Sequence, residues 1–365
     1  MKLYLIFFFA LIVSGCGGEE ADQPITLPSN LGIQTVVNPD GSGQVSVTAT
    51  AENANFYSIY FGEDSGESPV KATDGKATHV YAASGSYTIR VQAHATSDAF
   101  ISESEIVSVT LKDDQAIVIP TEGYTTPLTH DGMTLVWQDE FSGTSLNAEN
   151  WTFETGTGTN GWGNNELQYY RQDNTTLQDG YLVISAKNET FQGSDYTSSR
   201  IITKDKKFFK YGRVDIRAVL PEGQGIWPAL WMLGSNIGTA GWPACGEIDI
   251  MEMIGGSGRE KTVYGTAHWD NGGHDSSGKN YSLGTGTYAD KFHVFSIVWN
   301  ETSITWYMDD IQYNTVDTTP ATRSEFQNNF FFVFNLAVGG DWPGNPNSST
   351  EFPQHLIVDY IRMFQ

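Results

Sequence analysis

Cysteine is nearly absent from this sequence. Only Cys16 and Cys245 occur among its 365 residues, which excludes a scaffold held together by several disulfides. Tryptophan is absent from the first 136 residues, and all ten tryptophans lie at or after Trp137. The chain therefore has two regions of different composition, and we expect packed cores rather than covalent cross-links to stabilise it.

Positive charge is also scarce. Lys and Arg together number 20 against 43 Asp and Glu, which gives a formal net charge of −23 at pH 7. A surface of this sign repels a nucleic acid backbone, so the composition disfavours nucleic acid as a partner. The same charge is compatible with a neutral polymer such as a glucan.

The first fifteen residues have the pattern of an export signal. A short positive start precedes an apolar run over 3–13, which is shorter than the ~20 residues of a membrane-spanning helix. The small residues directly before Cys16 resemble a bacterial lipobox, which implies cleavage before Cys16 and acylation of its thiol. An ordinary signal peptide with an incidental cysteine is the alternative. Residues 16–23 are expected to be a flexible acidic tether, and Cys245 is then left without a disulfide partner.

Residues 24–112 alternate apolar and polar side chains in short runs such as "GQVSVTATA" and "SYTIRVQAHA", separated by turn sequences such as "NPDGSG". This pattern predicts a small antiparallel β-sandwich. The stretches "FGED", "HVY" and "GSY" resemble the polycystic-kidney-disease-type (PKD) immunoglobulin-like module. The resemblance implies glycan binding or a spacer role, and the spacer is favoured because the segment has no obvious aromatic platform.

Residues 113–127 are interpreted as a linker. From 128 to 365 the sequence consists of short strand-like runs, among them "YGRVDIRAVL", "FHVFSIVW" and "NFFFVFNLAV", separated by Gly, Asn and Asp. No long amphipathic helix is evident. A region of this length built from short strands predicts an all-β fold, namely one large β-sandwich or jelly roll.

The run "GEIDIME" places three carboxylates in six residues that begin at Glu247. Successive side chains of a strand point to opposite faces, so Glu247 and Asp249 share a face that Glu252 would miss. One extra residue near Met251, a β-bulge, would return Glu252 to that face. The Cα atoms of the two glutamates would then lie ~13 Å apart. Their carboxyl groups could approach to roughly 5–6 Å, near the separation in retaining glycosidases.

Clustered carboxylates raise one another's pKa, which suits a pair made of an acid/base and a nucleophile. By spacing alone, two other interpretations stay open. The acids could hold calcium, which prefers oxygen ligands, or they could form a solvated strand face with no chemical role.

Tryptophan-rich runs flank the acidic stretch. "GQGIWPALWML" carries Trp227 and Trp231, Trp242 lies five residues before Glu247, and "GWGNNELQYY" contains Trp162. Tryptophan rings are flat platforms for hexoses, but they are also good core material, so about half of the ten are expected in the core. The expected core members lie in strand-like runs: Trp137, Trp151, Trp299 and Trp306.

The region 131–365 resembles glycoside hydrolase family 16, in its laminarinase-like branch. The matching stretches, in order, include "WQDEF", "GWGNNELQYY", "SSRIITK", "YGRVDIRAVLPEGQGIWPALWML", "WPACGEIDIME" and "NLAVGGDWPG". The resemblance implies a β-jelly roll with a cleft across its concave sheet. It also implies endo-acting, retaining hydrolysis of β-1,3 linkages in glucans such as laminarin, with no cofactor required for catalysis.

The resemblance also assigns roles to individual residues. Glu247 is expected to be the nucleophile, Glu252 the acid/base and Asp249 the carboxylate between them. Cys245, which shares strand parity with Glu247, is expected to be a small buried thiol. Six positions are expected to contact substrate, although the last could instead be a structural histidine: Asn165, Arg200, Trp227, Trp231, Trp242 and His268.

A structural calcium away from the acids is implied by the same resemblance. Its expected ligands are Glu140, the backbone of Gly180 and Asp359. Oxygen ligands brought together from distant segments suit calcium. The alternative is that Glu140 and Asp359 are ordinary surface acids.

These expectations describe a monomeric, exported lipoprotein of the bacterial outer membrane or cell surface that acts on β-glucan and touches the membrane only through its lipid. The bulged spacing favours β-1,3-glucan, because the mixed-linkage β-1,3/1,4-glucanases of the family typically carry the shorter motif. A mixed-linkage or galactan substrate, a transglycosylase and a non-catalytic glucan-binding lipoprotein remain as alternatives.

Overall fold

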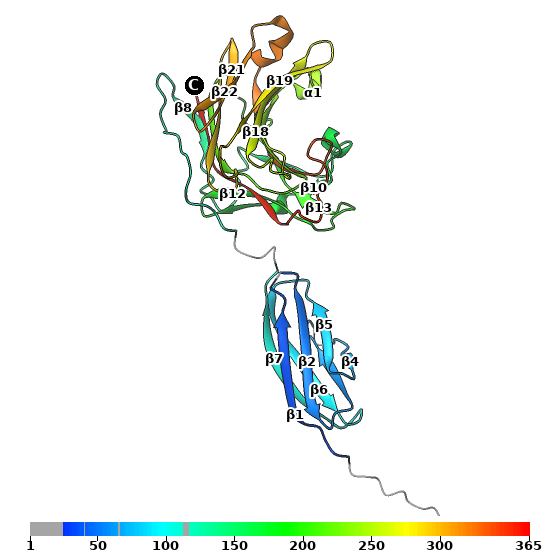
Figure 1. Ribbon diagram of the computed structural model, residues 1–365. Coiled ribbons are helices and arrows are strands. Elements are labelled where there is room, and N and C mark those ends of the chain that lie inside the picture. Colours follow the sequence, from blue (N-terminus) through cyan, green and yellow to red (C-terminus); the bar gives the residue numbers. More distant parts are fainter. Residues whose placement is uncertain (1–24, 40, 65, 112–116) are drawn as a thin grey trace, which may run out of the picture. The chain divides into compact units, whose positions relative to one another are not determined.

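The computed structural model describes residues 25–39, 41–64, 66–111 and 117–365. The chain divides into two compact units, 1–115 and 116–365 (Figure 1). The expected signal peptide, the lipidation site Cys16 and the tether lie outside the described residues. Within the described ranges, no helix has both the length and the apolar character needed to cross a membrane.

The first unit is a small β-sandwich, as the alternation in residues 24–112 predicts. Its core lies between two antiparallel sheets, where alternate residues of each strand, such as Val45, Val47, Ile89 and Val91, are buried. One sheet has the order β1(Ser29–Val37), β2(Gln44–Glu52), β5(Lys76–Val80). The other has the order β4(Val70–Ala72), β3(Phe56–Tyr60), β6(Gly85–His94), β7(Phe100–Val109).

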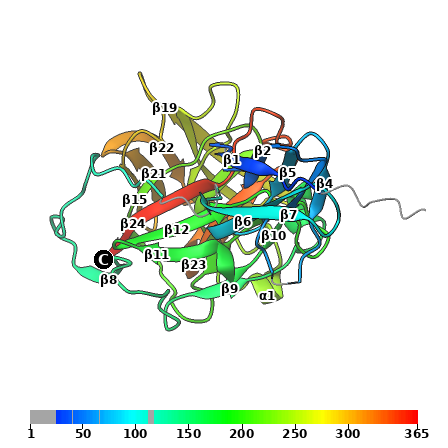
Figure 2. The same cartoon turned by 90° about the horizontal axis from the view of Figure 1, so that it is seen from below.

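The second unit is built from two large sheets with the main core between them (Figures 1 and 2). The eight-stranded sheet has the order β11(Thr175–Gln178), β12(Tyr181–Ala186), β24(Gln354–Phe364), β15(Gly212–Val219), β20(His293–Trp299), β21(Ser303–Met308), β22(Ile311–Asp317), and β8(Leu135–Asp139) also pairs with β24. The seven-stranded sheet has the order β19(His274–Ser282), β18(Thr262–Asp270), β17(Glu247–Glu252), β16(Ile226–Gly234), β23(Phe330–Val338), β14(Arg200–Ile202), β9(Thr152–Glu154). The all-β sandwich predicted from the short strand-like runs is confirmed.

Short elements complete the second unit. β10(Gln168–Tyr170) and β13(Tyr196–Ser198) form a two-stranded parallel ladder. The helical segments are brief: a π-helical turn η2(Gly161–Asn165), 3-10 turns η3(Gln172–Asn174) and η4(Ala321–Gln327), and α1(Ile237–Ala240). None of these described helices is a long amphipathic one, in agreement with the sequence.

Strand β23, which is apolar except for Asn335, shows why such a run becomes a central strand. All nine of its residues are buried. Phe330, Phe332 and Phe334 point into the main core between the sheets. Phe331 and Val333 point the other way and join a smaller cluster that contains the buried thiol of Cys245. A strand covered on both faces needs no polar alternation.

The segment 117–127, which the sequence assigns to a linker, is packed onto the second unit. Ile117 and Ile119 lie against a small buried cluster that includes Phe292. The amide of Tyr124 donates to the carbonyl of Phe292 at 2.9 Å, and the amide of Thr126 donates to the Tyr360 hydroxyl at 2.9 Å. From residue 117 onward, therefore, this segment is part of the folded unit.

Half of the tryptophans belong to the core, as expected. Trp151, Trp299 and Trp306 are buried, and Trp137 is partly buried against the same cluster. The fifth core member, Trp269, was not singled out from the sequence, although it alternates with His268 along β18.

Candidate active site

The acidic strand β17 contains the predicted bulge. Along its pairing with β18, Asp249 faces Thr266 and Glu252 faces Tyr264, so three steps on β17 match two steps on β18. The pairing with β16 shifts at the same place, between Asp249 and Met251. Ile250 and Met251 are consecutive, yet both are buried in the main core. The bulge thus returns Glu252 to the face of Glu247 and Asp249.

Gly246 lets the chain enter this strand. Its φ is +80°, and a Cβ built on it would lie 2.8 Å from the Cβ of Glu325 and 2.9 Å from the ring of Phe330. A side chain at 246 would therefore combine a left-handed backbone with two steric clashes. Glycine in "GEIDIME" thus fixes the position at which Glu247 begins the acidic row.

The three acids lie in a cavity of about 610 Å³ on the face of the seven-stranded sheet. Five of the six expected substrate contacts line it: Arg200, Trp227, Trp231, Trp242 and His268. Asn165 does not line it, because its amide donates to both carboxylate oxygens of Asp341 at 3.1 Å. Its neighbour Asn164 does line the cavity.

Trp162, one of the tryptophans considered from the sequence as a platform for hexoses, also lines the cavity. The sequence analysis assigned no role to several other lining residues: Glu166, Tyr264, Thr266, His274, Asn335 and Trp342. The sequence could have predicted that Tyr264 and Thr266 line the cavity, because in a strand they point to the same face as His268. Trp342 packs edge-on against Trp227, with ring centroids 5.5 Å apart, and against Tyr264 at 5.0 Å. These three rings form an aromatic wall next to Glu252.

Burial dominates the electrostatics of the acids. It raises the pKa of Asp249 to about 8. Burial, followed by repulsion from Asp249, raises the pKa of Glu252 to about 8 and holds that of Glu247 well above its ordinary range. The acids therefore resist simultaneous ionisation, and the row retains protons at neutral pH.

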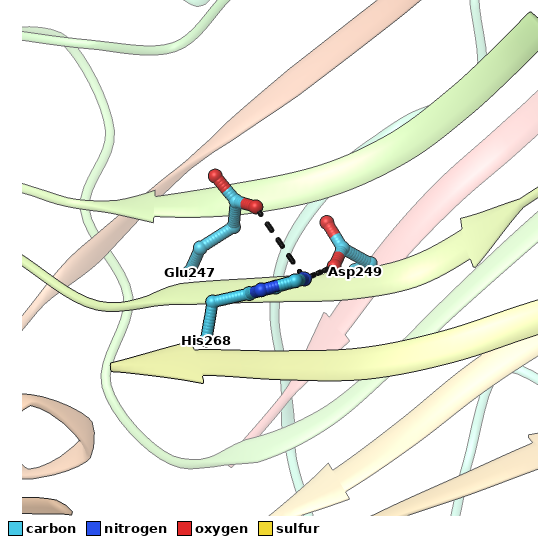
Figure 3. Close-up of side chains that lie close together, drawn as sticks. All are labelled: Glu247, Asp249 and His268. Atoms are coloured by element: carbon cyan, nitrogen blue, oxygen red, sulfur yellow. Dashed lines mark ion pairs between the residues drawn. The ribbon is translucent and has the colours of Figure 1, made fainter. Parts of the chain in front are cut away.

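His268 is the basic group nearest to the acidic row (Figure 3). Its Nε2 lies 3.1 Å from Oδ2 of Asp249 and 3.8 Å from Oε1 of Glu247. Its Nδ1 lies 2.8 Å from Nε2 of His274, so one proton is shared between the two rings. Positive charge on His268 opposes the upward shift of the Glu247 and Glu252 pKa values.

Trp227 holds the far end of the row. Its indole N–H donates to Oε1 of Glu252 at 3.1 Å. A hydrogen bond to a carboxylate oxygen favours the charged form, and here it partly offsets the effect of burial on the Glu252 pKa. Trp227 is thus a wall of the cavity and also orients the Glu252 carboxyl group.

A buried hydrogen-bond chain orients Trp231. Its indole N–H donates to Oδ1 of Asn335 at 2.7 Å, so the Asn335 amide nitrogen faces the Tyr170 hydroxyl and donates to it at 3.1 Å. That hydroxyl, whose pKa burial raises further, donates to Oε2 of Glu166 at 3.1 Å. Because an indole can only donate, the donor and acceptor of every hydrogen bond in this series are fixed, and Glu166 must accept the last one.

Arg200 lies between two aromatic walls. Its guanidinium carbon is 4.5 Å from the ring centroid of Trp162 and 5.0 Å from that of Trp231. Its Nε donates to Oε2 of Glu154 at 2.5 Å. Stacking and this ion pair hold the arginine in place, with its side chain mostly shielded from solvent.

The expected calcium ligands meet on another part of the fold. β24 pairs with β12 through Val358 and Leu182, and with β8 through Ile361 and Asp139. Residues 140, 180 and 359 therefore converge near one stretch of β24. Both side-chain carboxylates are already engaged, however. Arg362 donates to both Glu140 oxygens at 2.7 and 2.9 Å, and Arg217 donates to Oδ2 of Asp359 at 2.6 Å.

Both Glu140 oxygens accept a hydrogen bond from one guanidinium, and each keeps a further lone pair. Asp359 keeps its second carboxylate oxygen beside the one that accepts from Arg217. Calcium therefore stays a prediction at this position.

Comparison with known proteins places the acidic row in a family. The family model for glycosyl hydrolases family 16 matches residues 148–362. The chain is 39% identical over 233 residues to the clotting factor G alpha subunit of Tachypleus tridentatus, covering 63% of this chain and 34% of that protein. It is 39% identical over 295 residues to glucan endo-1,3-beta-glucosidase A1 of Niallia circulans, covering 73% and 41%. The chain thus spans less than half the length of either relative.

A solved structure agrees with the sequence matches. The laminarinase catalytic domain of Thermotoga maritima MSB8 is 45% identical, with a TM-score of 0.60, and the match covers 64% of this chain and 98% of that domain. The acidic row, the tryptophans of the cavity and the seven-stranded sheet all fall within the segment that the family model matches. The chain belongs to glycosyl hydrolases family 16.

Proposed function

We propose that the protein is a retaining endo-glycosidase that hydrolyses internal β-1,3 linkages of glucans such as laminarin. The observation that carries this proposal is the bulged strand β17, which aligns Glu247, Asp249 and Glu252 on the floor of an aromatic-lined cavity. Retaining glycosidases need two carboxyl groups that flank the scissile bond, about 5–5.5 Å apart. Relatives named as a laminarinase and as a glucan endo-1,3-beta-glucosidase support the β-1,3 linkage.

In the first step, Glu247 attacks the anomeric carbon and forms a glycosyl ester while the glycosidic C–O bond breaks. Glu252 gives its proton to the departing oxygen, and its raised pKa of about 8 keeps that proton available at neutral pH. In the second step, the Glu252 carboxylate takes a proton from water, and the resulting hydroxide attacks the ester. The attack takes place at the anomeric carbon and breaks its bond to the Glu247 oxygen, so the sugar leaves with its configuration retained after two inversions, and both glutamates are restored.

Asp249 and His268 influence whether Glu247 is ionised during these steps. Glu247 must be ionised to attack, although burial and Asp249 oppose its ionisation. A proton held on Asp249 removes that repulsion, and the positive form of His268, 3.8 Å from Glu247, favours the carboxylate. We assign substrate contacts to the aromatic walls, whose flat rings suit the face of a hexose. We assign a further contact to Arg200, whose N–H groups can donate to sugar hydroxyls.

Replacing the nucleophile tests the proposal. Glu247→Ser should lower the release of reducing sugar from laminarin by at least about 10³-fold, because no other group can form the ester. The exposed Glu149→Ser serves as a matched control and should retain wild-type activity. Near-normal turnover in Glu247→Ser would show that the nucleophile is assigned wrongly.

A product profile on laminarin, lichenan and agarose distinguishes the related substrates. We expect oligosaccharides from laminarin first, whereas faster release from lichenan would favour a mixed-linkage enzyme.

One relative is named as a clotting factor subunit rather than as a hydrolase, so a non-catalytic glucan-binding protein is the second candidate. Binding to laminarin in affinity electrophoresis, with no product from the wild type, would favour it. Added oligosaccharide acceptors would reveal transglycosylation.

We further propose that Cys16 carries a lipid that holds the exported, monomeric protein at the outer membrane or cell surface, with the PKD-like first unit as a spacer. Cys16→Ala should then move the protein from the membrane fraction to the soluble fraction. Equal membrane association of the variant would contradict the anchor.

A structural calcium held by backbone oxygens near Gly180 and by Asp359 is proposed for the second unit. It predicts a lower melting temperature after chelation, with the acidic row intact. An unchanged melting temperature in metal-free protein would refute it.

A further inference from the structure

We propose that Asp249, His268 and Glu247 form a binding site for a first-row divalent cation such as Zn²⁺, and that the bound cation excludes glucan from the cavity. The first half concerns only the geometry of three side chains. The second half rests on the proposed role of Glu247 as nucleophile.

The spacing of the three side chains suits a small cation. One ligand atom from each lies within 4.8 Å of the others, and Figure 3 shows the imidazole facing both carboxylates. Nε2 of His268 is 3.1 Å from Oδ2 of Asp249 and 3.8 Å from Oε1 of Glu247. Zinc bonds to N and O of about 2.0–2.1 Å put tetrahedral donors about 3.4 Å apart. Small side-chain shifts would therefore complete the site.

Asp249 supplies a second and independent indication. Its side chain is only 4% exposed, and among the residues that the structure describes its Oδ2 makes no hydrogen bond; its close neighbour is Nε2 of His268, the other ligand of the proposed site, at 3.1 Å. A buried carboxylate oxygen that makes no hydrogen bond costs free energy. A cation between Asp249 and His268 would satisfy this oxygen and would also relieve the repulsion between the neighbouring carboxylates.

His274 completes the site from outside. With a cation on Nε2, His268 keeps its proton on Nδ1, which lies 2.8 Å from Nε2 of His274 and can donate to it. Histidine ligands usually donate their other N–H in this way, which fixes the tautomer and the ring orientation. His274 is itself packed against Trp242, with ring centroids 4.6 Å apart.

The donor set selects the class of cation. An imidazole nitrogen disfavours Ca²⁺ and Mg²⁺, which prefer all-oxygen ligands. One nitrogen with two carboxylate oxygens suits Zn²⁺, Co²⁺ or Ni²⁺. Cys245 is buried in a separate apolar cluster, so the site supplies no thiolate for softer ions.

Calorimetry with Zn²⁺ tests the site without relying on activity. Metal-free full-length protein should bind one Zn²⁺, and His268→Gln should weaken this binding by at least about 100-fold, since the variant loses the nitrogen ligand. His79→Gln is the matched control, because His79 lies 3.3 Å from Glu63 in the first unit and its loss should leave the affinity unchanged. No binding by the wild type, or equal binding by His268→Gln, would overturn the proposal.

His274→Phe examines the outer contact separately, since Phe retains a ring against Trp242 but removes Nε2. We expect Zn²⁺ affinity about 10–100-fold below that of the wild type, and an unchanged affinity would overturn the role of His274.

In laminarin assays, Zn²⁺ should raise KM and leave kcat unchanged, whereas a fall in kcat alone would overturn the exclusion of glucan. If the wild type fails to cleave laminarin, the proposed function fails, and calorimetry still decides the metal site.

Discussion

Two buried aspartates, one on each large sheet, have opposite surroundings. On the outer face of the eight-stranded sheet, the fully buried Asp215 accepts hydrogen bonds from Arg213 at 2.7 Å, Ser296 at 2.7 Å and His130 at 3.0 Å. On the seven-stranded sheet, Asp249 is nearly as buried and lies 3.1 Å from the imidazole of His268, but within the described residues its Oδ2 makes no hydrogen bond and no arginine pairs with it. Burial raises its pKa to about 8.

The same contrast extends to their neighbours. Glu140 and Asp359 of the outer face each pair with an arginine, whereas Glu247 and Glu252 share the cavity with another carboxylate. A paired carboxylate stays ionised and holds structure together. An acid whose charge is opposed by burial can exchange its proton, which is what general acid catalysis requires. The following predictions are ordered from the largest expected effect to the smallest.

Glu252→Gln should have the largest effect. The amide cannot protonate the leaving oxygen, so kcat on laminarin should fall by about 10²–10⁴-fold. Asp359→Asn, on the outer face of the other sheet, should leave kcat unchanged. Similar losses of kcat in both variants would show that acids on the two sheets do not differ in role.

Asp215→Ala should have the largest effect on stability. It leaves the buried charge of Arg213 without its main partner, and breaking a buried pair costs about 3–5 kcal/mol of unfolding free energy. Asp249→Asn should leave the unfolding free energy unchanged or raise it. Denaturant titration of both variants gives the comparison, and a larger loss in Asp249→Asn would reverse it.

The pH dependence of stability sharpens the contrast. Glu252 has a folded pKa of about 8, above the unfolded value of about 4.3, so between these values the native state binds more protons. Stability should therefore fall as the pH rises through this window. Glu252→Gln removes this contribution.

The variant should match the wild type near pH 4 and melt a few degrees higher near pH 8, since 1 kcal/mol corresponds to about 2–4 °C in a domain of this size. Thermal unfolding at the two pH values measures the difference. A stability advantage that does not grow with pH would contradict the raised pKa.

Tyr170→Phe should have the smallest effect. It removes the hydroxyl that joins Asn335 to Glu166, and one lost buried hydrogen bond of about 1–1.5 kcal/mol corresponds to a change of up to about tenfold. We expect kcat/KM to fall by this factor mainly through KM, because Trp231 is a wall of the cavity and not a reacting group. Tyr169→Phe is the neighbouring control. An equal loss in both variants would contradict a role of this chain in positioning Trp231.

Strand parity accounts for what could be predicted from the sequence. The spacing of Glu247, Asp249 and Glu252 predicts the bulge, because side chains alternate with a period of two and the apolar residues between the acids must reach the core. The apolar run 330–338 likewise predicts a buried central strand. The parity of β18 would also have predicted that Tyr264 lines the cavity beside His268.

Parity gives no guidance in turns. The sequence favoured Asn165 as a cavity residue, whereas the structure brings Asn164 to the lining and bonds Asn165 to Asp341. The left-handed backbone at Trp162 and Asn165, with φ of 57° and 56°, sets these directions. Such a turn depends on contacts with the distant 339–346 loop, where the Asp341 amide donates to the Asn164 carbonyl.

The sequence by itself determined that the chain has two regions of different composition. Local alternation also indicated where strands run along the chain and on which face of β17 the acids lie. Only the tertiary structure decided which group lies beside each acid. Strand pairing placed His268 opposite Glu247, from where its imidazole reaches Asp249, and the fold placed an arginine beside Glu140 and another beside Asp359. The pKa of a carboxyl group depends on burial and on charges a few ångströms away, and those neighbours come from segments far apart in the chain.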